Sequence, residues 1–475
     1  MTSKTKNILP VILAGGSGSR VWPFSKNDLP KQFVKLKCGE TLFEKTLHNL
    51  VYQLQNNPNL INHVLVVTNE KYRFLCQNSL KKFSISFTVI LEPEKKNTAA
   101  SVCLAAKYCE HNYKDSIMFI MSSDHFISNK KKFSDSVKCI SNYILNNVSS
   151  FGMLGVNPSF ASTEYGYLET KAISDTKLYK VVNFKEKPKK NLAEKYLKSG
   201  NFLWNSGIFI FSPHLLINFI KNDSAFGKHL QASWKYRTND IFFIRPNPKS
   251  FHNIKPISFD YFFVEKIINL NIKIVTTILS SAWSDLGSWG TLENHLPKPN
   301  DSHSILSNNN SIFSNKVSVA IGVNDLLVFQ DEDILFIANK DIVNNNPLLV
   351  NKLLSEYPKL SENFNVVHRP WGYYEILDSH KNFLTKKITV FPKSKLSLQI
   401  HNFRSEHWII LDGVANVQIG KSFYKLKKNQ SIDIPIKKQH RLINDTNKNL
   451  ELIEVQSGSY IGEDDIKRVN DEYKR

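Results

Sequence analysis

From residue 8 to about residue 156, short apolar runs alternate with amphipathic stretches. The apolar runs are continuous and end in polar or turn residues, as buried parallel strands do. They read ILPVILA, HVLVVTN, FTVILEP, SIMFIMSSD and FGMLGV. Between them apolar residues recur at helical spacing, as in NTAASVCLAAKYC (97–109). This alternation predicts an open α/β sheet whose ligands bind at the carboxyl ends of the strands.

The pattern changes near residues 297–310, where the sequence becomes polar. Strand-like pieces follow (VSVAIGV, DLLVFQ, DILFIAN), and then a predicted helix, NPLLVNKLLSEY. From residue 368 onward, short strands at regular spacing with turn residues between them predict a barrel or jelly roll. We therefore expect an α/β domain over 1–296, a small β connector with a linking helix over 297–362, and an all-β domain over 363–475. No internal repeat stands out.

Composition narrows the class of protein. The chain has 475 residues, of which 41% are hydrophobic and 22% charged, which is typical of a globular protein of more than one domain. No apolar run approaches the roughly 18 residues of a membrane span. The net charge is +20, but the basic clusters are short and scattered, so we expect neither a nucleic-acid nor a membrane partner. The five cysteines include no CxxC pair, which favours free thiols in a reducing cytoplasm.

A glycine-rich loop follows the first predicted strand. It reads Gly15-Gly16-Ser17-Gly18-Ser19-Arg20. Glycines let backbone N–H groups approach phosphate oxygens, and Arg20 offers a bidentate positive charge. The spacing matches neither the Rossmann nor the Walker loop. The loop alone is also compatible with a sharp turn without function, but the nearby Lys31 favours a polyphosphate site.

Two distant carboxylates are candidates for a cation site. Asp124 ends the strand IMFIM, and Asp285 lies in WSDLGSW. Brought together, they would form a hard oxygen site for Mg²⁺, whereas either one alone would be a helix cap or a turn. Lys187, followed by a rigid proline in FKEKP, suits a second anionic substrate, although in isolation it fits a solvated face.

Taken together, residues 8–290 resemble the sugar nucleotidyltransferases, specifically the mannose-1-phosphate guanylyltransferases. The resemblance rests on motifs in the family's order: LAGGSGSRVWP (13–23), PKQF (30–33), EP (92–93) with NTAA (97–100), SDH (123–125), YGYLE (165–169), FKEKP (184–188), WNSG (204–207) and WSDLGSWG (283–290). It implies a Rossmann-like, GT-A type mixed sheet. It also implies transfer of GMP from GTP to mannose 1-phosphate, giving GDP-mannose and pyrophosphate.

The same resemblance implies residue roles. The nucleotide would be bound by Gly15, Gly16, Gly18, Arg20, Lys31 and Asn97. Mg²⁺ would be held by Asp124 and Asp285. Lys187 would face the sugar phosphate, and the sugar would contact Gly166, Glu169 and Asn205. The catalytic residues would be Arg20, Lys31, Asp124, Lys187 and Asp285.

The all-β tail contains a second constellation, QIHNFRSEHW (399–408), followed later by His440. Residues two apart on a strand share a face, so Gln399 and His401 point at one place. Glu406 and His440 complete a mixed nitrogen and oxygen set that suits Zn²⁺, Fe²⁺, Mn²⁺ or Co²⁺. We expect the neighbouring His407 either to point away from the ion or to contact its ligands from outside.

The tail resembles a cupin, and more closely the type II phosphomannose isomerase module that is often fused to mannose-1-phosphate guanylyltransferases. The motifs are VHRPWG (367–372), LSLQ (396–399), EVQSGSY (454–460) and GEDDI (462–466). The resemblance implies interconversion of fructose 6-phosphate and mannose 6-phosphate. It makes Gln399, His401, Glu406 and His440 ligands of Zn²⁺ or another divalent metal. Arg404 becomes a candidate for binding substrate phosphate or for catalysis.

Three hypotheses follow. The first is a homo-oligomeric enzyme with both activities that feeds GDP-mannose synthesis. The second keeps the guanylyltransferase and makes the tail an oligomerisation or regulatory module. The third is a sugar-nucleotide sensor without catalysis, which would require the Mg²⁺ carboxylates or Lys187 to be absent. Since these residues are present, the third is the weakest.

Overall fold

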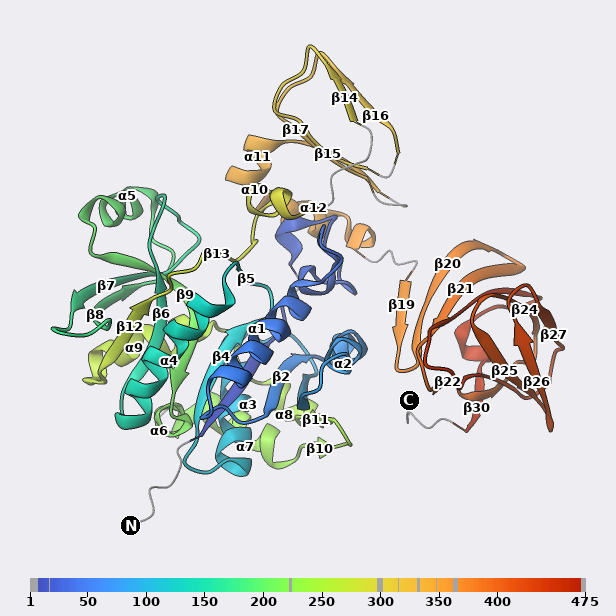
Figure 1. Ribbon diagram of the computed structural model, residues 1–475, viewed down its shortest axis with the longest axis horizontal. Coiled ribbons are helices and arrows are strands. Elements are labelled where there is room, and N and C mark those ends of the chain that lie inside the picture. The colour runs from blue at the N-terminus through green and yellow to red at the C-terminus, as the bar shows by residue number, and fades with distance from the viewer. Residues whose placement is uncertain are drawn as a thin grey trace. The chain divides into compact units, whose positions relative to one another are not determined.

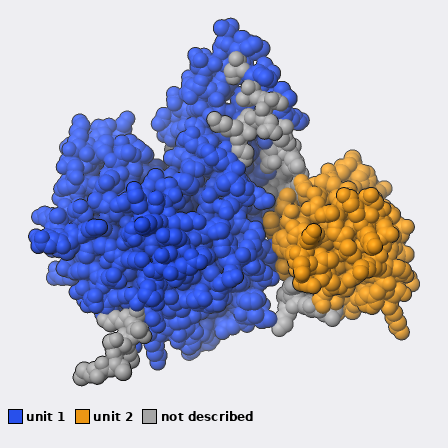
Figure 2. Space-filling view, viewed as in Figure 1, with its two compact units in different colours: residues 1–361 blue, residues 362–475 orange. Residues whose placement is uncertain are grey.

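A computed structural model describes residues 7–16, 18–221, 224–296, 302–314, 316–330, 334–346, 348–361 and 366–470. The chain divides into two compact units, residues 1–361 and 362–475, coloured separately in Figure 2. The predicted domain boundaries at 296 and 362 remain predictions, because residues 297–301 and 362–365 lie outside the described part.

Unit 1 is built on a mixed sheet, which confirms the predicted α/β class (Figure 1). Among the described residues the sheet has eleven strands in the order β10-β11-β3-β2-β1-β4-β9-β6-β12-β8-β7. The first strands pair in parallel, and β9 runs antiparallel between β4 and β6. The bounds are β1 (Ile8–Leu13), β2 (His63–Asn69), β3 (Ser86–Glu92), β4 (Ile117–Ser122), β6 (Phe151–Val156), β7 (Tyr167–Ala172), β8 (Tyr179–Lys185), β9 (Phe202–Phe211), β10 (Thr238–Asn239), β11 (Phe243–Arg245) and β12 (Ile274–Ile278).

Helices cover both faces of this sheet. They are α1 (Leu42–Asn56), α2 (Arg73–Leu80), α3 (Asn97–Asn112), α4 (Lys130–Asn146), α5 (Lys190–Ser199), α6 (Pro213–Lys221), α7 (Ser224–Lys235), α8 (Pro248–His252) and α9 (Glu265–Ile267). The short helix α10 (Trp289–Leu292) belongs to a separate buried cluster. Strand β1 is buried on both faces, as its continuous apolar sequence predicts. Leu9 and Val11 join one buried cluster, and Ile8 and Ile12 join the other.

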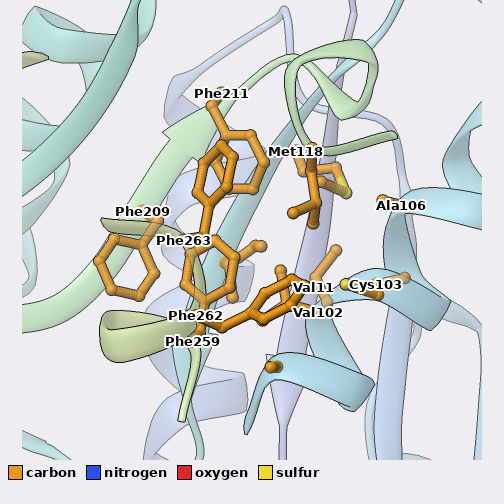
Figure 3. Close-up of a cluster of buried hydrophobic side chains, with 14 of the residues drawn as sticks. Val11, Val102, Cys103, Ala106, Met118, Phe209, Phe211, Phe259, Phe262 and Phe263 are labelled. Carbon is orange, nitrogen blue, oxygen red and sulfur yellow. The ribbon is translucent and has the colours of Figure 1, made fainter. Parts of the chain in front are cut away.

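Figure 3 shows part of the first cluster, in which Val11 and Val102 meet the phenylalanines of β9 and of residues 259–263. The rings pack closely. For example, the ring centroids of Phe211 and Phe259 are 5.9 Å apart, and the two ring planes are nearly parallel. Full burial of one such side chain contributes roughly 1.5–3 kcal/mol to folding. This rigid core fixes the ends of β1 and β4, where the candidate site residues begin.

The connector forms two stacked coils of parallel strands. Its elements are β14 (Ser302–Ile305), β15 (Ser311–Phe313), β16 (Ser318–Ile321), β17 (Leu326–Gln330), β18 (Leu335–Asn339), α11 (Lys340–Asn345) and α12 (Leu348–Glu356). Ser302 pairs with Ser318, and Ser311 pairs with Leu327, both sixteen positions apart. Asparagine side chains link the turns at the same interval: Asn324 accepts from the backbone N–H of Asn308. The sequence shows no internal repeat here, because two coils built from differing polar residues leave little sequence signal.

Unit 2 is all-β, as predicted, and its strands are paired in two sheets of the cupin type. Its core gathers buried residues such as Trp408, Ile410, Val417 and Leu442. The bounds are β19 (Val366–Arg369), β20 (Gly372–His380), β21 (Phe383–Val390), β22 (Ser394–Lys395), β23 (Leu398–Ile400), β24 (Arg404–Asp412), β25 (Val414–Ile419), β26 (Ser422–Lys427), β27 (Ser431–Ile434), β28 (His440–Asn444), β29 (Leu450–Gly458) and β30 (Lys467–Asn470).

In the part of the chain that the structure describes, no helix is both long enough and apolar enough to span a membrane.

Candidate active site and candidate metal centre

The glycine loop follows β1 and is held in place by Gln32. Its side-chain amide donates to the carbonyls of Ala14, at 3.1 Å, and Gly16, at 2.9 Å. Gly18 has φ +66°, and a Cβ there would lie 3.0 Å from Cβ of Lys31, so this position requires glycine. Ser17 lies outside the described residues. The sequence analysis gave Gln32 no role, although it stands next to Lys31 in the same motif.

A short antiparallel ladder brings the two candidate carboxylates together. Strand β5 (Phe126–Ile127) pairs with β13 (Trp283–Ser284), Ser284 opposite Phe126. Asp124 lies two residues before one strand, and Asp285 directly follows the other. Asp124 and Asp285, 161 positions apart in the chain, thus lie on adjoining segments beside the glycine loop.

Lys31 bridges the two segments. It lies in a short helical turn (Lys31–Phe33), and its side chain is almost fully buried. Its ammonium lies 3.2 Å from Oδ2 of Asp124 and donates to the backbone carbonyls of Asp285, at 2.5 Å, and Leu286, at 3.1 Å. A buried cation in this position neutralises charge at the centre of the candidate site.

The surroundings of Asp124 keep it ionised. Burial alone would raise the pKa of this carboxyl, but the charges of Lys31 and His125 and a hydrogen bond from Ser122 hold its pKa well below the usual range. Burial lowers the pKa of His125, while the charges of Asp124 and Asp285 oppose that shift. Both aspartates therefore lie close enough to His125 for their charges to act on its pKa.

Asp285 is fixed by neighbours from other parts of unit 1. Its Oδ1 accepts hydrogen bonds from the Tyr165 hydroxyl and from the backbone N–H of Gly287, both at 3.0 Å. A Cβ at Gly287 would lie 3.2 Å from Nη2 of Arg20, so the Arg20 guanidinium lies beside this turn. Arg20 also donates to Glu164 at 2.8 Å. Tyr165 was predicted only as part of a motif, and Glu164 was not predicted.

Several of the residues expected around a sugar lie near an acidic cluster. Asn205 donates to Asp260 at 2.8 Å, and its own backbone N–H donates to Gly166. A Cβ at Gly166 would lie 2.5 Å from the carboxylate of Glu186, the residue before Lys187. Lys187 itself is exposed. Lys187, Gly166 and Asn205 are therefore grouped.

Burial dominates the electrostatics of this cluster. It raises the pKa of Glu186 to about 8, with the charges of Asp260 and Glu265 adding to the rise and Lys187 opposing it. It raises the pKa of Asp260 to about 6. The raised pKa favours the protonated carboxyl of Glu186, which can donate a hydrogen bond as well as accept one. None of Glu186, Asp260 and Glu265 was predicted, since acids at scattered positions give no spacing signal.

Two predicted residues lie apart from this group. Glu169 is on β7 beside Tyr196, whose pKa is raised by burial and by the charge of Glu169. Asn97 is exposed at the start of α3 with φ 64°, and its side chain accepts from the N–H of Thr98. The structure shows neither residue in contact with the aspartates.

In unit 2 the predicted metal ligands converge on Glu406. Oε1 of this carboxylate lies 3.0 Å from Nε2 of His401, and its Oε2 lies 3.4 Å from Nε2 of His440. Candidate ligand atoms of the three residues all lie within 4.8 Å of one another, and all three side chains are buried. The register places Gln399 opposite His440, and their side-chain nitrogens are 3.4 Å apart.

The bonding of these side chains fits a metal ion. Three buried atoms make no hydrogen bond among the described residues. They are both ring nitrogens of His401 and Oε2 of Glu406. Nδ1 of His440 lies 2.9 Å from the carbonyl of Lys438; a proton there leaves the lone pair of Nε2 facing Glu406. Burial alone would raise the pKa of Glu406, but both histidines hold it well below its usual range. The set offers nitrogen and oxygen ligands without thiolate.

Two further predictions concern neighbours of this set. His407 is confirmed to point away, because its ring contacts the exposed Asp433 at 2.5 Å. Arg404 is fully buried; its Nε lies 3.5 Å from Oε1 of Glu406, and its Nη1 donates to the carbonyl of Gly462 at 2.9 Å. Gln456 also donates to Glu406, at 3.2 Å, a contact that the sequence did not reveal.

Comparisons with known proteins find a family for each of the two units. Residues 9–300 match the family of nucleotidyl transferases, and residues 357–471 match the C-terminal domain of mannose-6-phosphate isomerases. The chain is 34% identical to the mannose-1-phosphate guanylyltransferase RfbM of Salmonella typhimurium, over 98% of this chain and 97% of the relative. The chain belongs to the mannose-1-phosphate guanylyltransferase family.

Other members of this family are similar over their whole length. The alginate biosynthesis protein AlgA of Pseudomonas aeruginosa is 34% identical over 98% of this chain and 97% of its own. The solved structure of a mannose-1-phosphate geranyltransferase from Thermus thermophilus covers 73% of this chain and 99% of its own, with a TM-score of 0.60 and 22% identity. That likeness supports the fold. Membership of the guanylyltransferase family thus extends across both units.

Proposed function

We propose that unit 1 transfers GMP from GTP to mannose 1-phosphate, giving GDP-mannose and pyrophosphate. The observation that carries this proposal is the pairing of β5 with β13. It places Asp124 and Asp285 beside the glycine loop, with the Lys31 ammonium between them. Two carboxylates at one edge supply hard oxygen ligands of the kind Mg²⁺ prefers, with substrate phosphates completing its coordination.

The chain's own groups would divide the work as follows. Gly15, Gly16, Gly18 and Asn97 contact the nucleotide, and Arg20 and Lys31 neutralise its triphosphate. Asp124 and Asp285 hold Mg²⁺, which when bound would neutralise charge on the phosphates. Lys187 binds the sugar phosphate, and Gly166, Glu169 and Asn205 contact the sugar. Glu186 and Asp260, close to Asn205, extend that sugar site with hydrogen-bonding groups.

The reaction is one direct displacement. A phosphate oxygen of mannose 1-phosphate attacks the α-phosphorus of GTP, the bond to the bridging oxygen of the β-phosphate breaks, and pyrophosphate leaves with that electron pair. No side chain becomes covalently modified. The enzyme aligns two anions that repel each other and offsets their charge, which supplies most of the rate enhancement.

Substitution of the two aspartates tests this assignment. We expect Asp124→Asn and Asp285→Asn each to lower GTP-dependent pyrophosphate release by at least about 100-fold, since each removes a carboxylate from the centre of charge. Asp135→Asn, on the exposed side of α4, is the matched control and keeps normal turnover. Near-normal turnover of both site variants would place the cation elsewhere.

We also propose that unit 2 interconverts fructose 6-phosphate and mannose 6-phosphate. The observation that favours this second activity is the buried, under-bonded set of His401, Glu406 and His440, next to Gln399. These four residues would hold Zn²⁺ or another divalent ion, which would polarise the sugar carbonyl so that a proton moves between C1 and C2. Arg404 contacts Glu406 and so orients that carboxylate.

Removal of the metal separates this proposal from the hypothesis that unit 2 is only an oligomerisation or regulatory module. We expect dialysis against a chelator to abolish mannose 6-phosphate formation, and re-addition of Zn²⁺ or Mn²⁺ to restore it. The same samples, assayed with Mg²⁺ and GTP, keep guanylyl transfer. Full-length protein that is loaded with metal but does not isomerise would favour the second hypothesis.

The partners of the chain would then be GTP and hexose phosphates. All five cysteines lie among the described residues and are free, which supports a reducing compartment. We therefore place the reaction in the cytoplasm, where nucleoside triphosphates are available.

A further inference from the structure

Unit 2 contains a pocket whose walls are mostly charged. One end is formed by Gln399 and Arg404, which belong to the candidate metal centre. The remaining walls carry three further cations, Arg369, Lys386 and Arg468. Only two carboxylates, Glu454 and Glu463, accompany these four cations among the lining residues. A concave site with this excess of positive charge, open beside a candidate metal centre, favours an anionic ligand.

Lys386 is the most buried of the three cations. It lies on β21, is 6% exposed, and its ammonium is 4.5 Å from the ring centroid of Tyr374 and 4.0 Å from Glu454. Removing a lysine side chain from water is costly unless charge partners compensate. Glu454 lies 4.0 Å away, beyond hydrogen-bond distance, so the ammonium of Lys386 has donors that a ligand in the pocket can use.

Arg369 and Glu463 also line the pocket. The Arg369 guanidinium lies 5.4 Å from the ring centroid of Tyr374 and 3.2 Å from Glu463, whose other oxygen accepts from the Tyr374 hydroxyl at 2.7 Å. The charges of Arg369, Lys386 and Arg468 all lower the pKa of Glu463, although burial opposes them. The three cations therefore lie close enough to Glu463 for their charges to lower its pKa, and the carboxylate of Glu463 is the anion among them.

The strand register sets this place beside the metal centre. Arg468, on β30, is paired with Gln399 on β23. Lys386 is paired with Glu454, which lies two residues along β29 from Gln456, the residue paired with Glu406. Arg468 thus lies opposite a candidate metal ligand, and Lys386, on β21 (labelled in Figure 1), lies opposite Glu454, which accepts a hydrogen bond from Gln456.

We propose that Arg369, Lys386 and Arg468 bind the phosphate group of the hexose 6-phosphate, with the carbonyl end of the sugar at the metal centre. This assignment rests on the proposed isomerase activity of unit 2. A phosphate dianion is matched by two planar guanidinium groups and one ammonium. Glu463 is half exposed, so it gives way and the phosphate takes its place as the partner of Arg369. The subsite selects phosphorylated hexoses over free ones.

The test compares the variant Lys386→Met/Arg468→Gln with Lys387→Met. Lys387 is the next residue on the same strand, but it is more exposed and paired with Glu451, so it is a matched control. We expect the double variant to raise KM for fructose 6-phosphate at least about tenfold while kcat changes much less, because each charged hydrogen bond lost weakens phosphate binding. The control keeps the KM of the natural chain.

A second measurement reports binding instead of activity and needs no metal in unit 2. Fructose 6-phosphate is titrated calorimetrically into the full-length, metal-stripped protein and its variants. Binding to unit 1 is common to all of them, so the difference reports on unit 2. We expect the double variant to lose at least about tenfold in affinity, and unphosphorylated fructose to bind neither protein measurably. If the double variant does not fold, Arg369→Gln, next to the half-exposed Glu463, serves in both measurements.

The outcomes separate the two proposals. If the natural chain isomerises fructose 6-phosphate but the variants leave both KM and affinity unchanged, the phosphate subsite is overturned and the isomerase stands. If the natural chain binds fructose 6-phosphate through Lys386 and Arg468 but does not isomerise it when loaded with metal, the subsite stands and the activity is overturned.

Discussion

At the scale of single residues, the candidate active site depends on contacts between charged and polar groups that are far apart in the sequence. Lys31 carries the clearest example, because its one ammonium contacts Asp124 and two carbonyls of the Asp285 turn. The sequence pointed to Lys31 and both aspartates, since each stands in a distinctive motif. It did not point to Gln32 or Glu164, whose roles are visible only in their contacts with the glycine loop and Arg20.

Glu92 leads to a prediction about pH. Burial raises its pKa to about 8, although a hydrogen bond from Ser101 opposes the rise. Between pH 4.5 and about 8 the folded state keeps a proton that the unfolded state has lost, so the free energy of unfolding falls as pH rises, at a limiting slope of about 1.4 kcal/mol per pH unit. Glu92→Gln removes this dependence. Thermal unfolding should show the variant gaining stability over the natural chain from pH 5 to pH 8.5.

A constant difference in melting temperature between the two proteins across that range would contradict the protonated state of Glu92. The substitution keeps the size of the side chain and an acceptor for Ser101, so a loss of packing is not expected to mask the result.

At the scale of elements, the connector packs against the turns that carry the site. Trp289, four residues after Asp285, stacks on Phe336 of β18 with centroids 6.2 Å apart, and its indole donates to the carbonyl of Trp22. Trp22 lies two residues after Arg20, and its ring contacts Phe336 edge-on at 5.7 Å. One aromatic side chain of the connector thus supports both the Arg20 and the Asp285 segments.

We therefore predict that Phe336→Ala lowers kcat for guanylyl transfer several-fold and reduces the free energy of unfolding by about 2 kcal/mol, less than for a fully buried phenylalanine. Leu335→Ala, at an exposed position on the same strand, is the control. Steady-state kinetics and thermal unfolding measure the two effects. If both variants behave alike, the connector does not position the site.

The elements differed in how well the sequence predicted them. Strands β1 to β4 and the strands of unit 2 follow from apolar runs and regular spacing. Strands β5 and β13 are two residues each, too short for any periodicity, and yet they bring the aspartates together. The sixteen-residue coil of the connector also escaped detection, because its repeated contacts use asparagines whose neighbours vary.

At the scale of the whole molecule, the two activities lie in separate units. Every residue proposed for guanylyl transfer belongs to residues 1–361, and every residue proposed for isomerisation belongs to residues 362–475. We predict that a chain ending at residue 361 folds and transfers GMP but forms no mannose 6-phosphate. A folded fragment without guanylyl transfer, judged by circular dichroism and pyrophosphate release, would show that unit 1 needs unit 2.

The sequence by itself determined the order of the two units and the chemical types at the strand ends, because these depend on neighbouring residues. Strict alternation also singled out Gln399 and His401 as candidate metal ligands. Only the tertiary structure decided which distant groups meet: Lys31 with the Asp285 turn, Glu186 with Gly166, and the cations of the unit 2 pocket with Tyr374 and Glu463. These contacts depend on strand register and on packing between residues far apart in the chain. The sequence pattern does not directly indicate either of them.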